Sequence, residues 1–543
     1  MQKSVAIALA LVLSFGLQAQ QEAPDNWYNL DRTTNNYPGV SADKALEYLK
    51  GKTGQKVVVA VIDSGVDIEH EDLKDIIWTN TDEIPGNNRD DDNNGYVDDI
   101  HGWNFIGGAD GQNVNYENLE IVRIYNRYAK KYANRNVDGL PKDQKAEYKA
   151  MEEYKKIIDE KKAQWEPQLA QVGPMFDMAK GAVEAIGKKP ADITKEDVEG
   201  LSDDKFGVFK GIAARFMAET DFKGFYDEIE GYVEYMEGQV KYNYNTDFDA
   251  RDIVGDDPSD VDDTNYGNND VKGPDSMHGT HVSGIIAAVR GNGIGVEGVG
   301  GANVQIMSIR TVPNGDERDK DVANAIRYAV DNGASIINMS FGKGYSPYKG
   351  AVDAAVKYAE KNDVLLVHAA GNDGKKLTLT NNYPNDVYLK KGFLKPKSSR
   401  TWIEVGASSK DYDEALPASF SNYNKTLVDV FAPGHDIYST FPEDEYSAIS
   451  GTSMAAPMVA GIAAMLRSYF PDLTARQVRE IILASAIPVE LDVTKPGSED
   501  SIKFSQLSAT GSIANAFTAV KQAEVTKGKK KKTPARDASL SKF

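Results

Sequence analysis

Five short stretches of the chain are mainly apolar and rich in β-branched residues. They lie at 56–62, 304–309, 335–339, 364–367 and 402–405. Such runs are typical of strands buried on both faces, as in a parallel sheet. Helical patterns lie between them, for example over 322–331 and 351–361. The alternation predicts an α/β fold of three layers, in which helices cover both faces of a mostly parallel central sheet.

Residues 116–247 follow a different pattern, rich in Lys, Glu, Ala, Tyr and Met and poor in β-branched runs. Residues near helical spacing include Glu147, Met151, Tyr154 and Ile158. The prolines expected to break the helices are Pro141, Pro167, Pro174 and Pro190. We predict an inserted α-helical subdomain of several helices, between the two parts of a main domain at 20–115 and 248–526. It is either a spacer with no activity or a platform that contacts a substrate or a partner.

The two ends of the chain predict export and a basic tail. Lys3 precedes an apolar run from Val5 to Leu17, and Ala19 offers a small residue for cleavage. This pattern predicts a signal peptide at 1–19 and a secreted or periplasmic protein, with a buried N-terminal element as the alternative. No later segment is apolar for long enough to cross a membrane. Residues 527–543 are basic and predict a disordered tail, with binding to acidic surfaces as the alternative.

Composition narrows the partners that the protein can have. The chain has 543 residues, and 62 basic against 82 acidic side chains give a formal charge of −20. This charge repels nucleic-acid phosphates, so we expect no nucleic-acid partner. It suits hard cations such as calcium. Because the chain has no cysteine, an exported form must draw its stability from its core or from bound metal.

Three separate motifs carry the residue types that nucleophilic amide cleavage needs: an orienting anion, a base and a nucleophile. Asp63 ends the buried run Val-Ala-Val-Ile-Asp at 59–63, where an open parallel sheet forms its sites. His278 opens the run His-Gly-Thr-His-Val-Ser-Gly, in which His281 is expected to be structural. Ser453 lies in Ser-Gly-Thr-Ser-Met-Ala-Ala-Pro at 450–457, ahead of a small-residue helix whose dipole favours nearby negative charge.

These blocks, in the order Asp, His, Ser, resemble the subtilisin-like (subtilase) family of serine peptidases. The resemblance covers about residues 26–111 and 249–524, and it places the last core helix of the family at 511–520. It implies that Asp63 orients the imidazole, that His278 is the general base and then the acid, and that Ser453 attacks the peptide carbonyl. The implied function is that of a secreted serine endopeptidase with protein or peptide substrates. The usual inhibitory prodomain of secreted members is not evident before Asp63.

Two further blocks match the family. Val-Leu-Leu-Val-His-Ala-Ala-Gly-Asn ends at Asn372, which the resemblance makes the side-chain donor of an oxyanion hole, with the Ser453 backbone N–H as the second donor. Ile-Ile-Asn-Met-Ser-Phe-Gly ends in Ser340, Phe341 and Gly342. The resemblance implies that these three residues pair with substrate backbone and line the first specificity pocket. Lys343 replaces a second Gly, which leaves the charge preference of the pocket open.

An acidic loop at 90–99 predicts a structural Ca²⁺ site. Oxygen side chains alternate along it, and Gly95 stands at the sixth position, as in a calcium loop. His101 replaces the closing Glu, so Asp98 or Asp99 must complete the shell. The predicted ligands are Asp90, Asp92, Asn94, Tyr96, Asp98 and Asp99. A solvated acidic turn is the alternative, and a less regular acidic cluster at 256–263 is a second candidate.

Two other functions fit the same motifs. One is a secreted binding protein on a subtilase scaffold that has lost activity, against which the intact set Asp63, His278, Ser453 and Asn372 argues. The other is an esterase that uses the same triad. The strand at Ser340 to Gly342 favours an extended peptide substrate over a simple ester.

Overall fold

The computed structural model describes residues 23–218, 220–389 and 397–530. Its main sheet has nine strands in the order β10-β13-β7-β6-β5-β4-β1-β3-β2, and every pair is parallel except β10 with β13. The strands are β1 (Val57–Asp63), β2 (Gly102–Asn104), β3 (Val304–Arg310), β4 (Ile336–Met339), β5 (Leu365–Ala369), β6 (Trp402–Ser408), β7 (Val430–Pro433), β10 (Ile487–Pro488) and β13 (Ser512–Ile513). The five predicted apolar runs become β1, β3, β4, β5 and β6.

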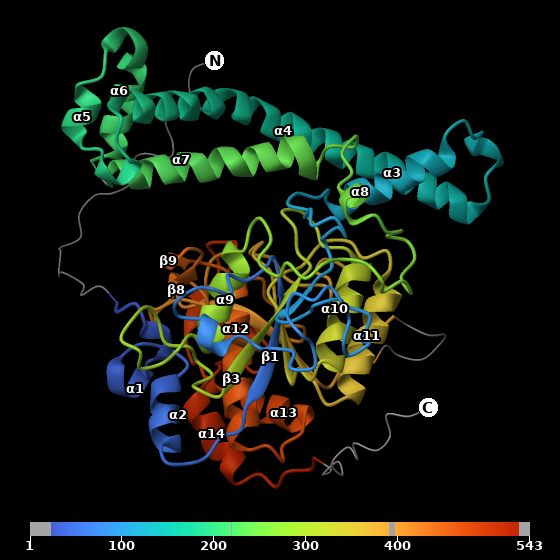
Figure 1. Ribbon diagram of the computed structural model, residues 1–543, viewed down its shortest axis with the longest axis vertical. Helices are drawn as coiled ribbons and strands as arrows, with labels where there is room; N and C mark the ends of the chain where they lie inside the picture. The colour runs from blue at the N-terminus through green and yellow to red at the C-terminus, as the bar shows by residue number, and fades with distance from the viewer. Residues whose placement is uncertain (1–22, 219, 390–396, 531–543) are drawn as a thin grey trace.

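Helices cover both faces of this sheet, which confirms the predicted three-layer α/β fold (Figure 1). One face packs on α2 (Ala42–Leu49), α9 (Met277–Ala287), α12 (Thr452–Tyr469), α13 (Ala475–Ser485) and α14 (Ala516–Glu524). The other face packs on α10 (Asp319–Asp331) and α11 (Lys349–Lys361). In β1, Val59 and Val61 face the first group, whereas Ala60 and Ile62 face the second. Alternate side chains point to opposite faces, so the whole run must be apolar.

Smaller elements complete the main domain. Two hairpins stand apart from the main sheet, β8 (Ile437–Phe441) with β9 (Glu445–Ile449), and β11 (Asp492–Thr494) with β12 (Ser501–Lys503). The short helices are α1 (Arg32–Asn35) and α8 (Arg251–Val254), with 3-10 turns at Trp27–Asn29, Lys74–Ile76 and Phe504–Gln506. The helix expected at 511–520 was placed too early. Ser512 and Ile513 form β13, and Asn515 caps α14 by accepting a hydrogen bond from the Thr518 N–H.

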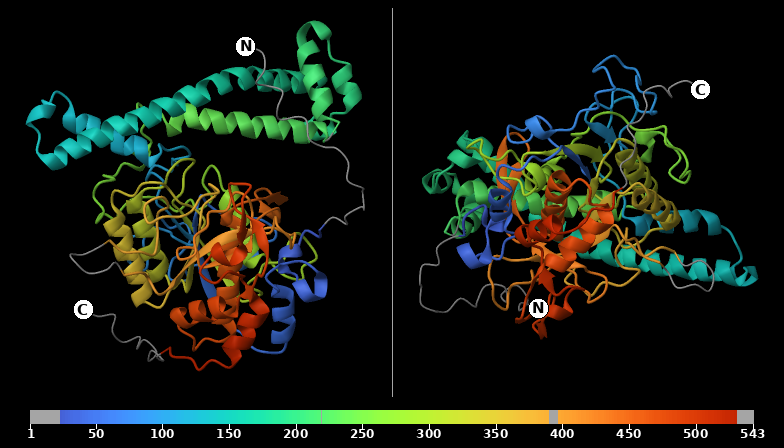
Figure 2. Two further views of the ribbon diagram at one scale, coloured as in Figure 1. Left: turned by 180° about the vertical axis from the view of Figure 1, so that it is seen from behind. Right: turned by 90° about the horizontal axis from the view of Figure 1, so that it is seen from below.

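The inserted segment forms a long helical arm beside the main domain (Figures 1 and 2). Its helices are α3 (Glu120–Tyr132), α4 (Lys142–Ile186), α5 (Lys195–Glu199), α6 (Asp203–Phe216) and α7 (Phe222–Glu237), with a π-helix at Gly238–Asn243 and 3-10 turns at Val137–Gly139 and Pro190–Asp192. Helices α4 and α7 run side by side, and α5 and α6 pack at one end of the pair. The arm has an apolar core of its own, to which Phe209, Phe222 and Phe225 contribute fully buried rings.

Two of the prolines do not break the arm as expected. Pro167 and Pro174 lie inside the single 45-residue helix α4, whereas Pro141 and Pro190 lie at helix boundaries as predicted. A proline inside a helix costs about 3 kcal/mol. Burial of apolar side chains on the same helix, including Phe176, offsets that cost by packing α4 against α6 and α7.

The ends of the described chain bear on two further predictions. The predicted signal peptide at 1–19 lies outside the described residues. Of the predicted tail at 527–543, residues 527–530 are described, and there Lys529 N–H donates to Gln477 and Lys530 N–H to the Asp472 carbonyl. Among the described residues, no helix combines the length and the hydropathy that a membrane crossing needs.

Candidate active site

Asp63 and His278 are hydrogen-bonded although 215 residues separate them in the chain. Asp63 is the last residue of β1, and its Oδ1 lies 2.7 Å from His278 Nδ1 in the first turn of α9. Asp63 is buried, whereas 31% of the His278 side chain is exposed. Burial alone would lower the pKa of His278, but the charge of Asp63 and their hydrogen bond raise it above its usual value. The pair presents an oriented imidazole whose second nitrogen is available to a reacting group.

Close approach of α9 to β1 depends on a glycine. A Cβ on Gly279 would lie 2.1 Å from the Gly65 carbonyl oxygen and 3.2 Å from the Asp63 Cβ. Both distances are shorter than an ordinary contact between non-bonded heavy atoms. Gly279 therefore sets how near the His278 backbone can come to Asp63.

Ser453 lies at the same edge of the sheet. It is the second residue of α12, and its Oγ donates to the Ser340 carbonyl oxygen at 3.0 Å, while the Ser340 Oγ donates to the Ser453 carbonyl at 2.8 Å. Ser340 follows β4, whose last residue, Met339, is in register with Ile62 of β1. Neighbouring strands lie about 4.8 Å apart, so Ser453 stands beside the Asp63–His278 pair. Among the described residues, no hydrogen bond joins Ser453 to His278.

Hydrogen bonds to its oxygen fix the Asn372 side-chain amide and leave the NH₂ group available as a donor. Its Oδ1 accepts hydrogen bonds from the Thr452 N–H at 2.9 Å and the Thr452 hydroxyl at 2.8 Å. Within the described part of the chain, no hydrogen bond uses its Nδ2. Asn372 and Ser453 both line one pocket of about 420 Å³. The arrangement provides a fixed donor near a serine hydroxyl at a helix N-terminus, where negative charge is favoured.

The predicted substrate residues line that same pocket, namely Ser340, Phe341 and Gly342. The Gly342 backbone makes no hydrogen bond to any other described residue, so its N–H and C=O are available to an added strand. The opposite edge of this segment is already paired, because Lys343 and Tyr383 exchange two backbone hydrogen bonds of 2.9 Å each. A Cβ on Gly342 would lie 2.5 Å from Asn382 Oδ1. A larger residue at 342 would therefore have to displace the Asn382 side-chain amide.

The ammonium group of Lys343 turns away from the pocket. Its Nζ lies 2.9 Å from Glu120 Oε2 and 3.0 Å from Asp319 Oδ1, and it donates to the Glu317 carbonyl at 2.7 Å. Glu120 belongs to α3, the first helix of the insertion. Burial works against its charge, but Glu120 and Asp319 hold the pKa of Lys343 above its usual range. Lys343 therefore brings no free positive charge to the pocket.

His281 has the structural role that was predicted for it. Its ring is fully buried, and Nε2 lies 2.9 Å from the Ile437 carbonyl and 3.1 Å from the Ser447 carbonyl. Burial lowers the pKa of His281 to about 3. The residue links α9 to the β8–β9 hairpin as a neutral imidazole.

The subtilase family model matches residues 54–509, which include the Asp63–His278 pair, Asn372 and Ser453. The chain belongs to the subtilase family. Among its curated relatives, it is 42% identical over 192 residues to the "Thermophilic serine proteinase" of Bacillus sp. (strain AK1), a match that covers 35% of this chain and 42% of that protein. It is 38% identical over 212 residues to subtilisin DY of Bacillus licheniformis, covering 38% of this chain and 70% of subtilisin DY.

Solved structures include a protease from Pseudoalteromonas arctica PAMC 21717. This subtilase and that protease are 20% identical, with a TM-score of 0.46 and coverage of 92% and 97% of the two chains. The sequence matches span less than half of several relatives, among them 23% of the "Cell wall-associated protease" of Bacillus subtilis (strain 168).

The acidic loop gathers three carboxylates, only two of which were predicted. Glu83, Asp90 and Asp92 each place an oxygen within 4.8 Å of the others. Asn94 lies against them, since its backbone N–H donates to Asp90 and Asp92. The set consists of hard oxygen donors, which fits Ca²⁺. Glu83 was missed because it lies seven residues before the patterned loop.

The other predicted ligands of this loop have partners within the protein. The Asp98 carboxylate accepts the backbone N–H groups of Asn87 and Asn88. The Asp99 carboxylate accepts the Tyr328 hydroxyl at 2.6 Å, and burial raises the pKa of Asp99 to about 6. The Tyr96 backbone N–H donates to Asn94, and its ring packs on Tyr328. The carboxylates of Asp98 and Asp99 are therefore not part of the Glu83–Asp90–Asp92 group.

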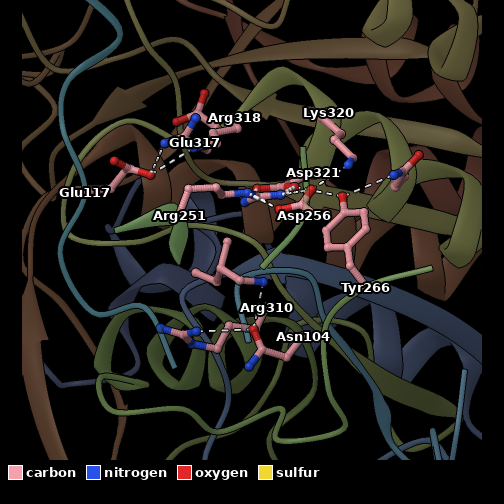
Figure 3. Close-up of polar contacts among 12 residues, drawn as sticks. Asn104, Glu117, Arg251, Asp256, Tyr266, Arg310, Glu317, Arg318, Lys320 and Asp321 are labelled. Atoms are coloured by element: carbon pink, nitrogen blue, oxygen red, sulfur yellow. Dashed lines mark hydrogen bonds and ion pairs between the residues drawn. The ribbon is translucent and has the colours of Figure 1, made fainter. Parts of the chain in front are cut away.

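The acidic cluster at 256–263 serves ion pairs instead of a metal (Figure 3). Asp256 pairs with Arg251 at 2.5 Å and with Lys320 at 2.5 Å, and Asp263 pairs with Lys320 at 2.9 Å. Arg251 also reaches Asp321 at 2.8 Å. These buried pairs tie the segment that leaves the insertion to α10.

Proposed function

We propose that this subtilase is a serine endopeptidase that cleaves peptide bonds through an acyl-enzyme, with Asp63, His278 and Ser453 as its triad. The observation that carries the proposal is the 2.7 Å hydrogen bond between Asp63 and His278 at the sheet edge where Ser453 begins α12. The relatives described above as a serine proteinase and a subtilisin support the same activity.

In the proposed first step, Ser453 turns its hydroxyl from the Ser340 carbonyl to His278 Nε2. This step is proposed to be a change of the Ser453 side-chain rotamer, with the backbone held in the first turn of α12. His278 takes the hydroxyl proton as Oγ attacks the scissile carbonyl, and Asp63 stabilises the imidazolium. His278 then gives that proton to the leaving amine, and water hydrolyses the acyl-enzyme by the same route.

The tetrahedral oxyanion is proposed to bind between Asn372 Nδ2 and the Ser453 N–H. Thr452 fixes the amide of Asn372 through two hydrogen bonds, so the donor needs no reorganisation during the reaction. The substrate backbone is proposed to pair with the free N–H and C=O of Gly342, alongside Ser340 and Phe341. This extended mode favours a peptide over a simple ester.

Calcium is proposed as a structural cofactor held by Glu83, Asp90, Asp92 and Asn94, with the Tyr96 carbonyl as a backbone ligand. Bound there, the ion would offset repulsion among three carboxylates and hold the loop against the main domain. We further propose that the chain is exported through the segment 1–19 and acts outside the cytoplasm. The helical arm is proposed to border the substrate path, since α3 contacts Lys343 at the pocket.

The proposal is tested by comparing the native chain with the Ser453→Ala variant on an unfolded protein and on a simple ester. We expect the native chain to cleave the unfolded protein and the variant to be inactive with an unchanged circular dichroism spectrum. Proteolysis by the variant at the native rate would refute the assignment of Ser453. Ester hydrolysis without any proteolysis would favour the esterase.

A further inference from the structure

The pocket that contains Ser453 borders a buried cluster with more carboxylates than cations. The carboxylates belong to Glu117, Glu120, Asp316, Glu317 and Asp319, and the cations to Arg123, Arg318 and Lys343. Asp316 and Glu317 line the pocket together with Ser453 and Asn372. The net charge of this cluster therefore determines which charge a substrate side chain meets in the pocket.

Each cation of the cluster is already paired with a carboxylate other than Asp316 or Glu317. Arg318 lies 2.7 Å from Glu117, a pair visible in Figure 3. Arg123 lies 2.6 Å from Glu120, and Lys343 contacts Glu120 and Asp319. The three cations thus pair with the carboxylates of Glu117, Glu120 and Asp319. The carboxylates of Asp316 and Glu317 have no described cation as an ion-pair partner.

One carboxylate oxygen of Glu317 is left without a partner in the pocket wall. It is 2% exposed, and its Oε1 has no hydrogen-bond donor among the described residues. Neither Glu317 nor Asp316 forms an ion pair with a described cation. The Asp316 carboxylate accepts one hydrogen bond, from the Glu120 N–H at 2.7 Å. A buried carboxylate oxygen without a partner is costly, so a native structure that keeps one calls for a group that pairs with it.

The electrostatics of Glu317 agree with this geometry. Burial raises the pKa of Glu317 to about 7, with Lys343 opposing the shift and the charge of Asp316 adding to it. A cationic group entering the pocket would favour the ionised form and supply the missing donor.

We propose that Asp316 and Glu317 make this enzyme select substrates with a lysine or arginine side chain on the acyl side of the scissile bond. The inference rests on the proposed peptidase function, because it assigns the substrate class of the same site. Glu120 of the insertion is the positioning residue, since its carboxylate pairs with the Lys343 ammonium at 2.9 Å and so occupies the cation that lies nearest to Glu317. The insertion thereby sets the charge of a pocket in the main domain.

The test uses quenched fluorescent peptides in which each acyl-side position carries in turn arginine or citrulline, its neutral analogue of similar shape. The ratio of kcat/KM for the two peptides isolates charge recognition from any change in overall activity. For the native enzyme we expect a ratio of roughly ten or more at one position. Citrulline lacks the positive charge of arginine and would leave the buried carboxylate without its ion-pair partner. The Glu317→Gln variant should bring the ratio close to one, and Asp316→Asn should lower it.

Glu199→Gln is the matched control, because Glu199 is an exposed residue at the end of α5, in the outer part of the arm. It should leave the ratio unchanged. If the native enzyme cleaves the peptides with a ratio near one at every position, the charge selection is wrong and the peptidase function stands. If Glu317→Gln keeps the native ratio, Glu317 is not the selecting residue. If no peptide is cleaved, the proposed function itself fails.

Discussion

Replacing Gly279 by alanine tests whether helix packing positions the catalytic imidazole. The added Cβ would stand 2.1 Å from the Gly65 carbonyl oxygen, so the two backbones must separate by about 1.5 Å to reach an ordinary contact. Gly65 cannot simply retreat. It adopts φ 127°, and a Cβ there would lie 2.1 Å from the Lys272 carbonyl oxygen, so it is itself tightly packed from the other side.

We expect this overpacking to destabilise the fold by about 1–3 kcal/mol. A catalytic group displaced by about 1 Å loses roughly a hundredfold in rate, so kcat/KM for a peptide should fall by that order. Stability is measured by denaturant unfolding in the Ser453→Ala background, which prevents self-digestion. Peptide hydrolysis is measured with the active serine in place.

Gly350→Ala is the matched control. Gly350 lies in the first turn of α11 as Gly279 lies in the first turn of α9, and its Cβ would meet only Leu389 at an ordinary 3.8 Å. Alanine there should be neutral or stabilise by about 0.4–1 kcal/mol. If Gly279→Ala matches this control in stability and keeps native kcat/KM, the packing argument is wrong.

Two further predictions concern protons and metal. Only neutral His278 can act as a base, and Asp63 raises its pKa above the ordinary 6.5, so kcat/KM should fall as the pH drops through that raised pKa. The acid limb should move to lower pH, with a lower maximum, in Asp63→Asn; an unmoved limb would contradict the coupling. Chelation of Ca²⁺ should lower the unfolding temperature of Ser453→Ala, and the Asp90→Asn, Asp92→Asn double variant should no longer respond; an unchanged melting curve would remove the calcium proposal.

Short local patterns were enough to predict the central sheet and the residues gathered at its edge. β1, β3, β4, β5 and β6 each place side chains in the cores on both faces of the sheet, a pattern typical of buried parallel strands. Asp63 ends β1, His278 and Ser453 lie in the first turns of α9 and α12, and Asn372 follows the end of β5 by three residues, so the topology of a parallel sheet brings them to one edge.

The features that were missed depend on contacts between distant parts of the chain. Lys343 meets Glu120 across 223 residues, so its neutralisation has no local signature. Pro167 stays within α4 because of packing that its neighbours in sequence do not reveal. Glu83 lies outside the calcium-loop pattern and joins it only through the folded turn.

Covalent labelling of Ser453 tests the central claim most directly. The native protein is treated with a serine-directed covalent inhibitor, and the modified peptide is located by mass spectrometry. We predict a single label on Ser453 that is absent from Ser453→Ala and forms far more slowly in His278→Ala, because the imidazole activates the hydroxyl. No label on Ser453, or labelling at the same rate without His278, would contradict the proposed catalytic site.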